Sequence, residues 1–150
     1  MSPIPEKIDK YRVLRAVARG GMAEVYEVED PSTGDHIALK LLLNTTSELE
    51  RFNREYEMMN CLNHPNVVRV YHYGLIDNDL PWITMELIEG TPVQSYVKGL
   101  GKAGSPRRTE EVIRIGHDLA RALDHIHRRG LLHRDLKSAN VLVLPDGRVK

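Results

Sequence analysis

The sequence has one cysteine, no excess of either charge and no long apolar run, and each of these absences excludes a class of protein. The single Cys61 excludes an internal disulfide and fits a reducing compartment, so we expect a cytoplasmic protein. The 21 basic and 21 acidic residues balance, which argues against nucleic acid or an anionic membrane as a partner. No apolar run approaches the roughly 18 residues of a membrane span, and the first residues lack the apolar segment of a secretory signal.

What the sequence does contain is typical of a soluble globular domain. It has 150 residues, of which 41% are hydrophobic and 28% are charged. Residues 1–10 carry two prolines and mixed charges, and we predict that they form a loose N-terminal arm. Residues 11–150 combine strand and helix patterns, and we expect them to form one domain.

Five segments have the apolar content and alternation of β-strands: residues 11–18, 24–29, 36–43, 67–76 and 81–87. The first two are joined by a turn at Gly20 and Gly21, and the next connection is the turn "PSTGD". Short turns of this kind connect antiparallel neighbours, so the first three strands are predicted to form an antiparallel meander.

Two longer segments have helical periodicity. Residues 47–62 begin with the capping-box spacing of Ser47 and Glu50, and Pro65 follows their end. Residues 109–130 begin at Thr109 as a predicted cap and end at a glycine, and a short helix is predicted at 93–100. The predicted buried stripe of the long helix consists of Val112, Ile115, Leu119, Leu123 and Ile126.

Three separated motifs occur in a particular order along this pattern. The glycine-bearing turn "ARGGMAEV" lies between the first two strands, a lone Lys40 lies in the strand "IALK", and "HRDLKSAN" follows the long helix. This order resembles the protein kinase family. The "GGM" turn and the segment "REYEMMNCLNHPNVVRVY" resemble the serine/threonine kinases common in bacteria. A glycine turn alone would be weak, but "HRDLKSAN", with its Asn five positions after its Asp, is a specific motif.

The resemblance covers residues 11–150 and implies an α+β, protein-kinase-like fold. Residues 11–88 would form the N-lobe, a five-stranded antiparallel sheet with one helix. Residues 89–150 would form the beginning of a mainly helical C-lobe, through the catalytic loop. The sequence ends at "PDGRVK", roughly three residues before the family's Asp-Phe-Gly motif would occur, so we expect an incomplete kinase domain that is inactive alone.

The resemblance also implies catalytic roles for five side chains. Lys40 would contact the ATP phosphates and Glu55; Glu57 is a rival partner, but it turns to a different face of its helix. Asp135 would accept the proton of the substrate hydroxyl, and Lys137 would neutralise charge on the transferred phosphate. Asn140 would hold Mg²⁺. Lys at position 137 indicates Ser/Thr rather than Tyr substrates in this family.

The implied ATP site has a phosphate loop, apolar walls and a backbone edge. Small residues in the loop let its N–H groups approach phosphates, although Ala18 and Ala23 replace two of the family's glycines and restrict the backbone. The adenine would lie between apolar walls and contact the backbone of two residues. The implied loop residues are Val17, Ala18, Gly20, Gly21 and Ala23; the walls are Val25, Ala38 and Met85; the backbone edge is Glu86 and Ile88.

The function implied by the resemblance is transfer of the γ-phosphate of ATP to Ser or Thr hydroxyls of proteins, with Mg²⁺ as cofactor. Protein substrates and ATP are the expected partners, with no nucleic acid and no membrane contact within this chain. Two alternatives remain open: a pseudokinase-like binding module without transfer activity, and a phosphotransferase for small molecules. A zinc site is not expected, because there is one cysteine and His125 and His127 face different sides of a helix.

Overall fold

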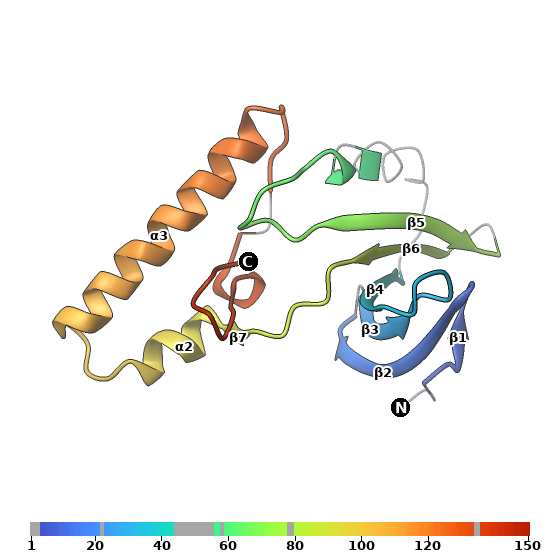
Figure 1. Ribbon diagram of the computed structural model, residues 1–150, viewed down its shortest axis with the longest axis horizontal. Coiled ribbons are helices and arrows are strands. Elements are labelled where there is room, and N and C mark those ends of the chain that lie inside the picture. Colours follow the sequence, from blue (N-terminus) through green and yellow to red (C-terminus); the bar gives the residue numbers. More distant parts are fainter. Residues whose placement is uncertain (1–3, 22, 44–55, 58, 78–79, 134–135) are drawn as a thin grey trace. The chain divides into compact units, whose positions relative to one another are not determined.

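The computed structural model describes residues 4–21, 23–43, 56–57, 59–77, 80–133 and 136–150 (Figure 1). The chain divides into two compact units. The first comprises Met1–Cys61 and Arg69–Leu87, and the second comprises Leu62–Val68 and Ile88–Lys150. Within the described part of the chain, no helix has the length and apolar character needed to cross a bilayer.

The first unit is built on one antiparallel sheet (Figure 1). Its six strands lie in the order β1-β2-β3-β4-β6-β5. Their bounds are Lys7–Ile8 for β1, Tyr11–Arg19 for β2, Ala23–Glu29 for β3, His36–Leu42 for β4, Val70–Ile76 for β5 and Leu80–Met85 for β6. The predicted meander of the first three long strands is confirmed as β2-β3-β4, and all five predicted strands are present.

The sixth strand, β1, corrects the prediction of a loose arm. Lys7 and Ile8 pair with Arg12 and Tyr11 across a tight turn, in which Asp9 has a positive φ of 53°. Ile8 is only 3% exposed and packs in the main core. A two-residue strand is too short to produce a visible alternation, so composition did not reveal that one apolar side chain would fix this segment to the sheet.

One face of the sheet carries the main core of the first unit. Its buried members are Ile8, Tyr11, Tyr26, Val28, Ile37, Leu39, Leu41 and Trp82. Tyr11 and Trp82 pack edge to face, with ring centroids 5.4 Å apart. The Trp82 ring also covers Gly74 on the neighbouring strand, where an added Cβ would lie 2.3 Å from a ring carbon. Glycine is therefore required at position 74 by this close approach.

The predicted helix at 47–62 is described only at its end. Residues 56–57 and 59–60 are helical, and Tyr56 packs in a small cluster with Val70 and Ile83. The Tyr56 hydroxyl donates a hydrogen bond of 2.8 Å to the carbonyl of Tyr71. The proposed capping box of Ser47 and Glu50 lies outside the described residues.

The second unit contains two helices and a small hairpin. The helices are α2, Val93–Gly99, and α3, Pro106–His127; a short 3-10 helix, η1, spans Ser138–Asn140. The strand β7, Thr91–Pro92, pairs antiparallel with β8, Leu142–Val143. The core is formed by Ile115, Val141, Val143 and Val149, with Val93, Tyr96, Val97 and Leu119 packed around them. The short helix predicted at 93–100 is confirmed.

The start and the stripe of α3 differ from the prediction. The helix begins three residues before Thr109, with Ser105 as the N-cap and a proline at the first helical position, where its missing N–H has no cost. The helix ends at His127, three residues before the predicted end, and Gly130 lies in the left-handed region at φ 73°. Ile115 and Ile126 are buried as expected, but Val112 is 46% exposed. Periodicity identifies an apolar face, but it does not determine how much of that face is covered.

Candidate functional site

The β2–β3 hairpin positions the predicted phosphate loop. The backbone N–H of Gly20 donates a 3.0 Å hydrogen bond to the carbonyl of Ala23, which closes the turn. Ala18 pairs with Val25, and a register shift between Ala16 and Ala18 forms an irregularity at Val17. The structure thus brings together in one hairpin the described loop residues that the sequence analysis selected: Val17, Ala18, Gly20, Gly21 and Ala23.

The turn itself does not require its two glycines. Neither Gly20 nor Gly21 is among the glycines with positive φ. An added Cβ at Gly20 would have its nearest neighbour at 3.6 Å, and one at Gly21 would meet nothing within 4 Å. Both glycines are exposed. Their lack of side chains therefore leaves the loop backbone uncovered, as close approach by a phosphate would need.

The strand register places the predicted pocket residues on one face of the sheet. Val25 on β3 is paired with Lys40 on β4, and Ala38 is paired with Met85 on β6. Directly paired residues of antiparallel strands point to the same side, and residues two apart on a strand also share a side. Ala18, paired with Val25, joins them. Five residues from four strands therefore share the face opposite the main core: Ala18, Val25, Ala38, Lys40 and Met85.

Lys40 is the cation of this face. It is half-buried, its strand neighbours Leu39 and Leu41 are buried, and no ion pair joins it to another residue among those that the structure describes. A half-buried ammonium among apolar side chains is stabilised by an anionic partner. The predicted partner Glu55 lies outside the described residues, and the rival Glu57 is exposed.

The chain leaves β6 at the predicted backbone edge. The N–H of Glu86 donates to the carbonyl of Arg69 at 2.8 Å, which extends the pairing of β6 with β5. Glu86 belongs to the first unit, whereas Ile88 is the first residue of the long segment of the second unit. Both are half-buried.

The predicted catalytic segment belongs to the second unit. Lys137 caps η1 in an extended conformation, and the N–H of Asn140 donates to the carbonyl of Lys137 at 2.9 Å. Val141 and Val143 are buried directly afterwards, and Val143 lies in the short strand β8. This burial fixes the segment that carries Lys137 and Asn140. Asp135 lies outside the described residues.

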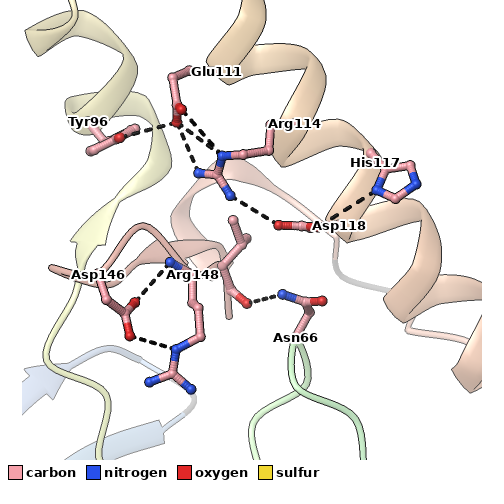
Figure 2. Close-up of polar contacts among 9 residues, drawn as sticks. Asn66, Tyr96, Glu111, Arg114, His117, Asp118, Asp146 and Arg148 are labelled. Atoms are coloured by element: carbon pink, nitrogen blue, oxygen red, sulfur yellow. Dashed lines mark hydrogen bonds and ion pairs between the residues drawn. The ribbon is translucent and has the colours of Figure 1, made fainter.

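A set of side-chain contacts holds the second unit together (Figure 2). The guanidinium of Arg114 donates to Glu111 at 2.9 Å and to Asp118 at 3.1 Å, and the Tyr96 hydroxyl donates to Glu111 at 3.2 Å. The contact thus joins α2 to α3. The hydrogen bond from Arg114 lowers the pKa of Glu111, so this carboxylate remains charged at neutral pH.

Asn66 has a positioning role that the sequence analysis missed. Its amide Nδ2 donates to the carbonyl of Val149 at 2.8 Å (Figure 2), and the Lys150 ammonium donates to the carbonyl of Val67 at 3.3 Å. These bonds fix the hairpin after the catalytic segment to residues 62–68. The segment "NHPN" was interpreted only as the end of a helix, although polar residues on both sides of Pro65 are a signal for side-chain contacts in a fixed turn.

The described residues of the face with Lys40 suit a nucleotide. The face with Lys40 offers apolar walls and one cation, which match an adenine and a phosphate. No group of three or more His, Cys, Asp or Glu side chains in the described ranges is arranged to hold a metal ion. His127 is exposed and His125 is half-buried, in agreement with their predicted positions on different sides of α3.

The comparisons with known proteins agree with this arrangement. Residues 11–150 match the model of the protein kinase domain family. The probable serine/threonine-protein kinase PknB of Lactococcus lactis is 37% identical over 147 residues, covering 95% of this chain and 23% of that protein. A mutant of the Mycobacterium tuberculosis PknI kinase domain has a TM-score of 0.83 and 33% identity, covering 99% of this chain and 61% of that structure. Rad53 residues 1–466 with AMP-PNP has a TM-score of 0.78 and 27% identity, covering 94% of this chain and 37% of that structure.

Proposed function

Because the chain belongs to the protein kinase family, we propose that the protein transfers the γ-phosphate of ATP to Ser or Thr hydroxyls of protein substrates. The chain spans 23% of the PknB relative, so the activity proposed is that of the whole protein. The observation that carries the proposal is the shared sheet face of Ala18, Val25, Ala38, Lys40 and Met85. It combines apolar walls, a cation and a neighbouring uncovered loop, which together suit a nucleoside triphosphate. Rad53, a structural neighbour, carries the nucleotide analogue AMP-PNP.

We assign the steps of transfer to side chains in both units. Lys40, held by Glu55, would orient the phosphates beneath the loop of Gly20 and Gly21. Asp135 would orient the substrate hydroxyl and accept its proton, and Lys137 would offset the negative charge that develops on the transferred group. Asn140 would contribute an amide oxygen to Mg²⁺, which neutralises phosphate charge when bound.

The proposed cellular setting follows from the substrate and from the cysteine count. ATP is abundant in the cytoplasm, and the single Cys61 is exposed and free. A reducing compartment suits such a thiol. We therefore propose a cytoplasmic location for these residues, with signalling by protein phosphorylation as their role.

The test uses the protein translated from its gene up to the natural stop codon. Transfer of radiolabelled phosphate from ATP to a Ser/Thr-containing protein is measured with Mg²⁺, and nucleotide affinity is measured by calorimetry. Lys40→Met and Asp135→Asn are each expected to lower transfer by at least about 100-fold, since each removes a charged group that acts in the transition state. Lys102→Met and Asp146→Asn are matched controls at exposed positions, and both should retain activity.

Two outcomes would favour the other candidate functions. Binding of ATP without transfer to any protein would indicate a pseudokinase-like module. Phosphorylation of an aminoglycoside in preference to a peptide would indicate a small-molecule phosphotransferase. If Asp135→Asn left the rate of phosphate transfer unchanged, Asp135 would not be the base.

A further inference from the structure

His64 connects three parts of the second unit. It lies in the segment 62–68, and its ring packs against His125 on α3, with ring centroids 4.9 Å apart and an interplanar angle of 44°. Two residues on, the amide of Asn66 donates to the carbonyl of Val149 in the hairpin that follows the catalytic segment (Figure 2). His64 is half-buried and lines an open cavity of about 620 Å³, so water reaches its ring. A change at His64 can therefore affect both α3 and this hairpin.

The contact between His64 and Asn66 requires an uncharged imidazole. The backbone N–H of Asn66 donates to Nδ1 of His64 at 3.1 Å, and the N–H of Val67 donates to the His64 carbonyl at 3.1 Å, which closes the turn. An imidazolium carries a proton on both nitrogens and accepts no hydrogen bond. Protonation of His64 would set two N–H groups against each other, so the contact with Asn66 would be lost.

The second ring of the pair is held in the same form. The guanidinium of Arg129 donates to Nδ1 of His125 at 3.2 Å. A guanidinium is a donor only, so this Nδ1 is also an acceptor. The observed packing is therefore that of two neutral rings. A proton on His64 would place a positive charge against a ring whose own partner is a cation.

The other charges around His64 do not favour a positive charge there. The charged and titratable side chains that surround it lie on α3 and at the end of the hairpin: His117, Asp118, Arg121, Asp124, His125 and Arg128 on α3, and Lys150. Both carboxylates of this set already accept hydrogen bonds, Asp118 from Arg114 at 3.1 Å and Asp124 from Arg128 at 2.8 Å. Their negative charges are thus offset by guanidinium groups on the same helix.

These surroundings determine the pH at which the ring takes up a proton. Burial lowers the pKa of His64 below its ordinary value of 6.5, and His125, Arg121 and Lys150 lower it further, while Asp118 acts in the opposite direction. The ring is therefore neutral at pH 7 and becomes charged only in acidic solution.

We propose that His64 is a pH-sensitive switch that controls the connection between residues 62–68 and the hairpin 142–150. When the imidazole is neutral, His64 packs on His125 and holds the N–H of Asn66, which directs the Asn66 amide to Val149. When the imidazole is protonated, the ring moves away from His125, the N–H of Asn66 is released, and the Asn66 amide leaves the Val149 carbonyl. The proposal concerns the conformation of the second unit and does not rest on the proposed kinase activity.

The primary experiment is an NMR titration of the protein, isotope-labelled in histidine and asparagine, from about pH 7.5 to about pH 5. The ring nitrogens of His64 should titrate with a midpoint below 6.5, and the backbone and side-chain amide signals of Asn66 should shift with the same midpoint. Nuclear Overhauser contacts between the rings of His64 and His125 should be present at the upper pH and lost at the lower one. Asn66 signals that stay constant while His64 takes up its proton would overturn the proposal.

A variant that keeps the acceptor but cannot take up the proton isolates the cause. His64→Asn replaces Nδ1 by an amide oxygen on the same carbon, Cγ, and an Asn side chain at this place accepts the N–H two residues on. The Asn66 signals of this variant should stay constant with pH. His64→Ala removes the acceptor and should give Asn66 signals shifted toward those of the acidic form at every pH. His127→Asn is the matched control at an exposed position on α3, and it should retain the full transition.

Two results with these variants would contradict the proposal. One is a transition of the Asn66 signals that persists in His64→Asn with an unchanged midpoint, which would assign the response to another group. The other is loss of the transition in His127→Asn. Circular dichroism checks that each variant folds, and if His64→Ala does not, the comparison of the unmodified protein with His64→Asn still decides.

Discussion

The ion pairs of the two units connect residues at different separations along the sequence. In the first unit three pairs cross between β2 and β3: Arg12 with Glu29, Arg15 with Glu27 and Arg19 with Glu24. In the second unit three pairs lie within one turn of α3: Glu111 with Arg114, Arg114 with Asp118 and Asp124 with Arg128. The first set supports a strand register, whereas the second set mainly supports a helix that would form locally.

The apolar cores of the two units also differ in how strongly they depend on contacts between distant residues. The first unit buries side chains from β1, β2, β3, β4 and β6 in one cluster, with Tyr11 and Leu39 fully buried. The second unit has a smaller cluster around Ile115, and α3 leaves Val112 and Ile113 exposed. The sheet unit thus depends on contacts between distant residues. The helical unit combines local helix stability with a modest core, and substitutions can separate these contributions.

The largest effect is expected from deleting a core side chain of the sheet. Leu39→Ala should lower the free energy of unfolding of the first unit by about 3 kcal/mol, because the side chain is fully buried and leaves a cavity. Trp82 is the only tryptophan of the chain and packs in the same core, so its fluorescence during urea unfolding reports this unit. Ile115→Ala is the counterpart in the second unit. If it shifts the Trp82 transition as much as Leu39→Ala does, the two units unfold as one.

The next largest effect is expected at the close contact between Gly74 on β5 and the Trp82 ring. Gly74→Ala should destabilise the first unit by about 2 kcal/mol, because the new methyl group collides with the Trp82 ring. The emission maximum of Trp82 should shift as the ring moves. Gly21→Ala is the matched control, since nothing lies within 4 Å of the added carbon. An unchanged spectrum and stability in Gly74→Ala would show that the ring does not cover this position in solution.

A smaller effect is expected from the polar contact between α2 and α3. Arg114→Ala should lower the free energy of unfolding of the second unit by about 1 kcal/mol, because it removes the partner of both Glu111 and Asp118. Far-UV circular dichroism during urea unfolding measures the change. Arg12→Ala removes an exposed cross-strand pair in the first unit and should cost about 0.5 kcal/mol or less. A larger loss of unfolding free energy in Arg12→Ala than in Arg114→Ala would contradict the partial burial of the Arg114 contact.

The smallest effect is a pH dependence specific to the second unit. The folded-state pKa of His64 is lowered from its ordinary value of 6.5, first by burial and then by His125. The unfolded chain therefore binds more protons at this group, so the unfolding free energy of the second unit should fall as the pH drops below about 6.5. Urea unfolding at pH 7.5 and 5.5, in buffer without phosphate, measures this. His64→Gln should reduce the slope, and an unchanged slope would assign it to another group.

The sequence predicted the long strands well because their signal is local. Alternating residues and turn glycines define β2, β3 and β4 within about one residue of the observed ends, and the order of the motifs correctly identified the fold family. The prediction was poorer wherever a distant contact decides the outcome. Ile8 joins the sheet because the main core accepts its side chain, and Asn66 reaches Val149, which is 83 residues away.

For the candidate site, too, some features were predicted from the sequence and others were missed. The common face of Val25, Ala38, Lys40 and Met85 follows from strand order and register, which the motif spacing anticipates. The helix start at Ser105 was missed because Thr109 looks equally suitable as a cap in the sequence alone. The catalytic roles of Glu55 and Asp135 stay predictions, since both lie outside the described residues.

The turn between β3 and β4 has a consequence for the face that carries Lys40. Asp30 accepts hydrogen bonds from the N–H of Gly34 at 2.7 Å and, through its carboxylate, from the N–H of Ser32 at 2.8 Å. Gly34 adopts a φ of 77° that suits glycine. Side chains alternate between the two faces along a strand. Shortening or lengthening this loop by one residue would therefore exchange the two faces of β4, and the Lys40 ammonium would point into the main core. The proposed nucleotide recognition would therefore depend on the length of a loop that need not contact the nucleotide.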